Sequence, residues 1–193
     1  FFEPGKVVAS PLVSLADDGA DLDGTPASFD YEGVAKRRVP LIEAGACREV
    51  VHDSKTADAA GVASTGHALP APNASGPFPF NLSMAAGETS REELIGGLER
   101  GLLVTRFHYT KAVHPKQVRI TGLTKDGLFL VENGRVIGPV RNLRFTQSYL
   151  DALAAVEAVG SERRAVDGDD YLGTIVVPAV RIGSFGFTGT TEH

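Results

Sequence analysis

The chain has 193 residues, of which 42% are hydrophobic and 22% are charged, proportions typical of a folded globular protein. Its formal net charge of −5 provides no basic excess for binding phosphates, so direct contact with nucleic acid is not expected. No apolar run approaches the ~20 residues that a membrane-spanning helix needs, so no membrane association is expected. The single cysteine, Cys47, excludes an internal disulfide framework and favours the cytoplasm.

The first residues, FFEPG, have neither the basic segment nor the apolar segment of a secretion signal. They are typical of the interior of a polypeptide, and we therefore expect the chain to be part of a longer protein. Residues 1–193 are predicted to form a single C-terminal domain of that protein. Within it we expect an irregular lead-in over residues 1–28 and the core of the domain over residues 29–193.

Acidic residues and glycines gather between Asp17 and Gly24. A calcium loop of the EF-hand type needs a glutamate at its twelfth position, but the twelfth residue counted from Asp17 is Ser28. Asp and Gly are common turn formers, so the segment is interpreted as solvated turns.

The next segments predict a hairpin and then a long loop. Residues 38–43 are strand-like, and residues 47–51 are expected to return beside them. A short helical turn is predicted over residues 54–61. Four prolines favour an extended loop over residues 69–87.

The clearest helix start is Ser90, because a serine cap with Glu93 three residues later can form a capping box. This helix is expected to end at Gly101. Strand-like segments follow at residues 102–109, 117–121, 128–132 and 135–140. Asn133-Gly134 predicts a type I′ turn between the last two of them.

A second helix is predicted over residues 148–159, followed by a loop over residues 161–170. Two strands, 174–180 and 181–187, complete the chain. The fold class predicted from these elements is α+β, with a mainly antiparallel β-sheet or partly closed barrel and two principal helices.

Candidate catalytic and metal-binding groups are sparse. The histidines are His52, His67, His108, His114 and His193, and their spacings match no common metal site. We therefore expect no metal ligands and no cofactor within this chain, with the histidines at the surface or in pockets. Cys47 is interpreted as a small core residue. The sequence has no nucleophile elbow, phosphate-binding loop or dinucleotide-binding fingerprint, so no catalytic residue is assigned.

Several segments, in their order along the chain, resemble one family, the TldD/PmbA family. They are FDYEG (29–33), LIEAG (41–45), STG (64–66), SREELI (90–95), GLLVT (101–105), TG (121–122), GLFLVENG (127–134) and VPAVRIG (177–183). The resemblance begins near residue 29 and covers nearly all of the remaining chain. Each motif is weak alone, and the ordered set carries the resemblance.

The resemblance implies the C-terminal portion of a larger two-domain protein with a β-rich α+β fold. TldD-like members are zinc-dependent peptidases that carry a His-Glu-x-x-x-His helix upstream of the matched region and a cysteine ligand near the C-terminus. PmbA-like (TldE) members lack these ligands and pair with TldD to cleave unfolded or leader peptides. The present sequence has no His-Glu-x-x-x-His and no cysteine between Gly160 and Pro178, so it looks more like the PmbA branch.

The leading hypothesis is therefore a non-catalytic, structural and peptide-binding domain of a TldD/TldE-type peptidase assembly. The implied partners are a TldD-like subunit, or a second copy of the chain, and a peptide or unfolded protein. Extended peptides commonly bind by adding a strand to a sheet edge, and segments 103–110 and 128–140 are candidate edges. Arg106, His108 and Tyr109 are the candidate peptide-binding residues, although ordinary exposed strand positions would have the same composition.

Two alternatives remain open. The chain could belong to an active zinc peptidase whose metal ligands lie upstream of Phe1, so that zinc is held by the full-length protein or its partner. It could also be a protein-binding module acting on gyrase or another partner, because the family bears the older name of modulators of DNA gyrase.

Overall fold

The computed structural model describes residues 3–166 and 173–190, and the chain divides into two compact units. Unit 1 comprises Phe1–Val7, Val13–Ala86 and Arg163–Pro178. Unit 2 comprises Val8–Leu12, Gly87–Glu162 and Ala179–His193. Each unit is therefore built from segments that are distant in the sequence.

A six-stranded mixed sheet has the strand order β3-β2-β1-β4-β10-β9. Its strands are β1 (Leu15–Asp17), β2 (Val39–Glu43), β3 (Ala46–Cys47), β4 (Asn81–Met84), β9 (Val156–Val166) and β10 (Thr174–Ile182). Neighbours β1 and β2 are antiparallel, as are β1 and β4, whereas β10 runs parallel to β4. The strand β1 thus lies in the interior of the sheet, although residues 1–28 were expected to be irregular.

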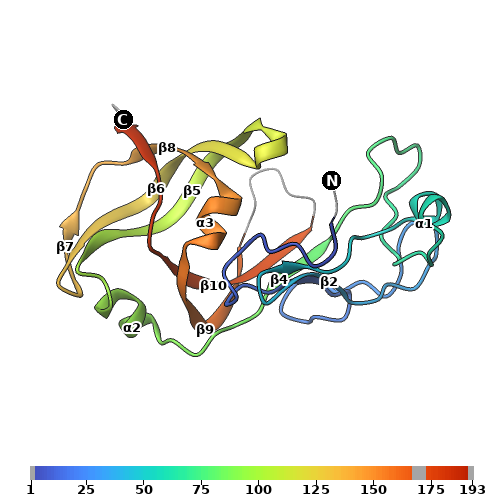
Figure 1. Ribbon diagram of the computed structural model, residues 1–193, viewed down its shortest axis with the longest axis horizontal. Helices are drawn as coiled ribbons and strands as arrows, with labels where there is room; N and C mark the ends of the chain where they lie inside the picture. Colours follow the sequence, from blue (N-terminus) through green and yellow to red (C-terminus); the bar gives the residue numbers. More distant parts are fainter. Residues whose placement is uncertain (1–2, 167–172, 191–193) are drawn as a thin grey trace. The chain divides into compact units, whose positions relative to one another are not determined.

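A five-stranded antiparallel sheet lies in unit 2, with the path β11-β8-β6-β5 and with β7 paired to β6 (Figure 1). Its strands are β5 (Arg100–His114), β6 (Arg119–Glu132), β7 (Arg135–Pro139), β8 (Leu143–Ser148) and β11 (Phe187–Thr190). A 3-10 turn at Pro115–Gln117 joins β5 to β6. The turn between β6 and β7 is the predicted one, because Asn133 and Gly134 have φ angles of +49° and +72°.

Three short α-helices occur within the described residues: α1 (Ser54–Ala60), α2 (Arg91–Gly96) and α3 (Tyr149–Ala154). The predicted capping box of α2 is present, because Ser90 accepts from the Glu93 N–H while Glu93 accepts from the Ser90 N–H. Asp53 caps α1 in the same way. The predicted α+β class with mainly antiparallel strands is confirmed, and the sheets are open rather than closed into a barrel.

Several predicted boundaries are wrong. The helix expected over residues 148–159 ends at Ala154, and β9 begins at Val156 because Val156, Ala158 and Val159 are buried along a strand. The helix that starts after Ser90 ends at Gly96, well before Gly101.

Other predicted loops and strands also differ. The strand β4 lies inside the expected loop 69–87, and β9 extends through much of the expected loop 161–170, whose residues 167–170 lie outside the described residues. The return strand expected over residues 47–51 is reduced to β3. Residues 174–182 form one continuous strand rather than parts of two.

Each unit has its own apolar core. In unit 1 the buried residues include Val13, Ala16, Val39, Ala57, Ala68, Met84 and Val176. In unit 2 they include Leu94, Leu128, Val131, Phe145, Ala152, Val156 and Val159. No helix of the described residues has the length and apolar character required to cross a membrane.

Candidate functional site

The first candidate site is the outer edge of β5. In the part of the chain that the structure describes, β5 pairs with β6 alone, from Arg100↔Glu132 to His114↔Arg119 (Figure 1). A long edge strand presents a row of backbone donors and acceptors to which another chain can pair. Residues 103–110 therefore lie at a sheet edge, as expected. Of the second candidate edge, 128–140, residues 128–132 do not lie at an edge, because this part of β6 has β5 on one side and β7 on the other. The remaining part contains β7 (Arg135–Pro139), which pairs with β6 alone among the described strands.

Two of the three predicted peptide-binding residues share one face of β5. Arg106 and His108 are two positions apart, so their side chains leave the strand on the same face, opposite to Phe107. Phe107 packs against the rings of Phe145 and Phe185, with centroids 4.7 and 5.3 Å away. The face that carries Arg106 and His108 therefore lies opposite this aromatic cluster.

Tyr109 lies at an irregular position of the same strand. Its φ angle is +54°, and the pairing with β6 shifts register between His108 and Lys111. A bulge of this kind redirects the neighbouring side chains. The Tyr109 ring lies 6.1 Å from the ring of His108 and 4.7 Å below Lys111 Nζ, and the side chain is largely exposed. The structure therefore brings the predicted residues together on one stretch of edge strand, and their role in peptide binding stays a prediction.

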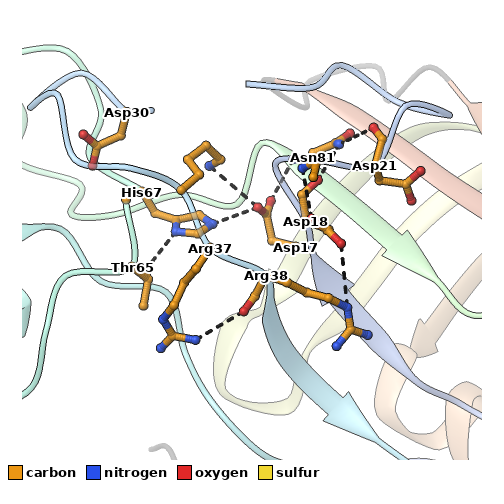
Figure 2. A network of polar contacts seen from close by, with 12 residues as sticks. Asp17, Asp18, Asp21, Asp30, Arg37, Arg38, Thr65, His67 and Asn81 are labelled. Atoms are coloured by element: carbon orange, nitrogen blue, oxygen red, sulfur yellow. Dashed lines mark hydrogen bonds and ion pairs between the residues drawn. The ribbon is translucent and has the colours of Figure 1, made fainter. Parts of the chain in front are cut away.

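The second candidate site is a buried polar network in unit 1, centred on Asp17 (Figure 2). His67 Nε2 lies 2.8 Å from Asp17 Oδ1, and the backbone N–H of Asn81 donates to Asp17 Oδ2 at 2.7 Å. Lys36 Nζ lies 3.6 Å from Asp17 Oδ1. The side chains of Asp17 and His67 are fully buried, and that of Lys36 is 2% exposed. A buried carboxylate is thus held between an imidazole, an amide and an ammonium group.

The network extends on both sides of Asp17 and ties distant segments together. The Thr65 hydroxyl lies 2.8 Å from His67 Nδ1 and accepts from the His52 N–H at 2.7 Å. Asn81 Nδ2 donates to the carbonyl oxygens of Asp18 and Asp21, at 2.7 and 3.0 Å. Both ring nitrogens of His67 are therefore engaged within the protein, so this histidine has a structural rather than a ligand-binding environment.

The pKa of the Asp17 carboxyl lies below its ordinary value. Burial alone would raise this pKa, but the hydrogen bonds from His67 and Asn81 and the positive charge of Lys36 outweigh burial. The ionised carboxylate consequently stabilises the folded state, because its pKa is lower there than in the unfolded chain.

This shift predicts a pH dependence of stability. The stabilisation is complete above about pH 4, the ordinary range of an Asp pKa, and is lost as the pH falls from there through the folded-state pKa. We expect the free energy of unfolding in urea to fall over this window more steeply in the wild type than in Asp17→Asn. Equal slopes for the two proteins would contradict the assignment.

No group of three His, Cys, Asp or Glu side chains placed to hold a metal ion occurs within residues 3–166 and 173–190. Cys47 is half-buried at the end of β3 rather than in the core. The expectation that the histidines lie at the surface or in pockets is wrong for His67, which is fully buried. The interpretation of Asp17 as part of a solvated turn is also wrong.

Sequence reasoning missed the Asp17 network for an identifiable reason. Asp17 and His67 are 50 positions apart, and no local pattern joins them. One available signal was that Asp17 directly follows the short apolar stretch of β1, where a strand can carry an acidic side chain into the interior. Another was the Ser64-Thr65-Gly66 motif, which places Thr65 beside His67.

The comparisons agree with this architecture. A profile of the PmbA/TldA metallopeptidase C-terminal domain matches residues 2–189. The chain therefore belongs to the PmbA/TldA metallopeptidase family and represents its C-terminal domain.

Curated relatives include a metalloprotease TldD homolog from Buchnera aphidicola, which is 27% identical over 85% of this chain and 34% of its own length. A metalloprotease from Methanothermobacter thermautotrophicus is also 27% identical, over 83% of this chain and 35% of its own length. The chain thus spans about a third of the length of the curated relatives that it matches.

Among solved structures, TldE from Thermococcus kodakarensis matches with a TM-score of 0.82 and 25% identity, over 96% of this chain and 42% of its own. A protein from Thermotoga maritima described as a candidate modulator of a DNA gyrase matches with a TM-score of 0.80 and 25% identity, over 96% of this chain and 41% of its own.

Proposed function

We propose that this domain is a non-catalytic part of a TldD/TldE-type peptidase assembly that holds an extended peptide along the outer edge of β5. The observation that carries the proposal is the pairing of this 15-residue strand with β6 alone among the described strands. A peptide that adds to such an edge gains main-chain hydrogen bonds, which give affinity without strong sequence preference. Binding without strong sequence preference is what an assembly that acts on unfolded chains requires.

The side chains beside the edge support the same role. Arg106 and His108 offer polar contacts on one face, and the bulge exposes the aromatic ring of Tyr109. Alternate side chains of an added strand would point to the two faces, where such groups could contact them. The proposed partner is a TldD-like subunit, which supplies the zinc and the catalytic residues, and the likeness to TldE supports this division of roles.

A binding measurement tests the proposal. We expect the triple variant Arg106→Ala/His108→Ala/Tyr109→Ala to bind a fluorescent unstructured peptide about tenfold more weakly in anisotropy titrations, which corresponds to ~1.4 kcal/mol. The matched control is Arg91→Ala/Glu92→Ala on exposed positions of α2, which should bind like the wild type. Equal affinity of the triple variant and the wild type would contradict the proposed role of these residues.

The second candidate function is that of a domain within an active zinc peptidase. The curated relatives named as metalloproteases favour it. The two candidates differ in metal content, because an active peptidase requires a resident zinc ion held by residues outside this chain. Stoichiometric zinc in the purified full-length protein, together with peptide hydrolysis without a partner, would support this second candidate and contradict the non-catalytic one.

A further inference from the structure

A pocket in unit 1 lies next to the Asp17 network and shares no lining residue with β5. Its volume is about 300 Å³, which is at the lower end for small-ligand sites. The aromatic side chains of Phe29, Tyr31 and Phe80 line it together with Lys36, Asp30 and Thr25. Phe29 and Tyr31 are 67% and 66% exposed, so the aromatic wall is accessible from outside.

Lys36 is the unusual member of this lining. Its side chain is 2% exposed, yet its Nζ atom has no hydrogen-bond partner within the described residues. The ammonium group lies 5.4 Å from the centroid of the Phe80 ring, which is also part of the pocket wall. An ammonium group has three donors, and a buried donor without an acceptor is unfavourable. Because the Nζ atom itself has almost no accessible surface, the Lys36 side chain must turn toward the pocket for an acceptor atom of a bound molecule to satisfy it.

The charges around the pocket favour a neutral hydrogen-bond acceptor over an anionic one. The charge of Lys36 is already balanced by Asp17, 3.6 Å away. Asp30 adds a second carboxylate to the lining, and its oxygens accept from the backbone N–H groups of Glu32, Val34 and Ala68. A further anion would therefore enter a site whose positive charge is already neutralised. A neutral carbonyl oxygen would avoid this penalty and still accept from Lys36.

We propose that this pocket binds an aromatic residue of a polypeptide, with the ring against Phe29, Tyr31 and Phe80 and a main-chain carbonyl oxygen accepting a hydrogen bond from Lys36 Nζ. The polypeptide nature of the ligand rests on the proposed function, since the chemistry of the pocket requires only an aromatic group with a neutral carbonyl. Aromatic rings pack favourably against one another in tilted or offset arrangements, which the walls provide. Strand-edge contacts alone are not selective for sequence. The pocket would give the assembly a preference for aromatic residues.

The test uses N-acetyl-phenylalaninamide as the probe and the full chain labelled with ¹⁵N, followed by NMR chemical shifts. We expect saturable shifts of residues 25–36 and Phe80. Affinity should be at least tenfold higher than for N-acetyl-alaninamide, which lacks the ring, and than for N-acetyl-phenylalanine, which carries a carboxylate. Equal or tighter binding of the carboxylate, or no binding of the amide, would overturn the proposal.

Variants separate this pocket from the rest of the molecule. Phe29→Ala/Tyr31→Ala should weaken binding of the amide about tenfold, because both rings are wall residues whose exposed positions leave folding intact. The control Leu22→Ala, at a position 83% exposed and outside the pocket lining, should bind like the wild type. Unchanged binding by the double variant would overturn the proposal.

Two further results separate amide binding in the pocket from self-association of the chain and from peptide binding at β5. Shifts of the same residues that follow protein concentration and do not respond to the amide would indicate a second copy of the chain in the pocket and overturn the assignment. The triple variant of β5 should bind the amide normally. If that variant loses peptide binding but still binds the amide, the two sites bind their ligands independently of each other.

Discussion

Replacing Asp17 with asparagine is expected to lower the free energy of unfolding by ~3–5 kcal/mol, the cost of removing one partner of a buried ion pair. The substitution keeps the size of the side chain but leaves the ammonium of Lys36 without its counter-charge at a position 2% exposed. It also replaces one acceptor oxygen by a donor group, opposite the donors His67 and Asn81. Urea unfolding of the full chain measures the loss.

The neighbouring residue provides a matched control. Asp18 makes an ion pair with Arg38 at 3.8 Å near the surface, so Asp18→Asn should cost at most ~1 kcal/mol. The double variant Asp17→Asn/Lys36→Met removes both charges and should recover part of the loss. A loss for Asp17→Asn no larger than for Asp18→Asn would show that the network does not stabilise the fold.

The second large effect is expected at Gly66, whose substitution by alanine should lower the free energy of unfolding by ~2–6 kcal/mol. Its φ angle is +74°, a left-handed conformation that costs about 1–3 kcal/mol for a residue with a side chain. An added Cβ would also lie 2.6 Å from the carbonyl oxygen of Ala35 and 2.7 Å from Lys36 Cα. Relief of this overlap would push the backbone that carries Lys36 away from His67, at a further ~1–3 kcal/mol.

A substitution at Gly33 distinguishes the cost of the left-handed conformation from the cost of the close contact with residues 35–36. Its φ angle is +77°, nearly that of Gly66, but an added Cβ would meet no atom within 4 Å. Gly33→Ala should therefore show the conformational cost alone, and the difference between the two variants in urea unfolding measures the close approach to residues 35–36. Equal losses for the two would contradict the importance of this contact.

Local signals in the sequence predicted local structure well. The Ser90–Glu93 capping box and the Asn133-Gly134 turn were predicted because every atom involved lies within four residues. The segment after α3 was predicted as helix because Leu150, Leu153 and Ala154 share one helical face and Gly160 suits a helix end, although the same segment can also form a buried strand. Only the burial of Val156, Ala158 and Val159 in β9 decides between them.

Long-range features could not be predicted in this way. The contacts of Asp17 with His67, Lys36 and Asn81 join four segments of the chain, and no spacing in the sequence encodes their approach. The edge position of β5 likewise depends on the strand order of the whole sheet. The functional expectation came from the ordered family motifs, because the spacing of the histidines and of the cysteine indicated no catalytic or metal site.

Hydrogen exchange measured by mass spectrometry, with and without an unstructured peptide, tests strand addition at β5 most directly. An added strand would engage the outward backbone amides of Arg100–His114, so we expect peptide-dependent protection concentrated in this strand. The strand β8 (Leu143–Ser148), which lies between β11 and β6 in the same sheet, should show no such change. Unchanged exchange in β5, with protection elsewhere in a chain saturated with peptide, would contradict the proposed role.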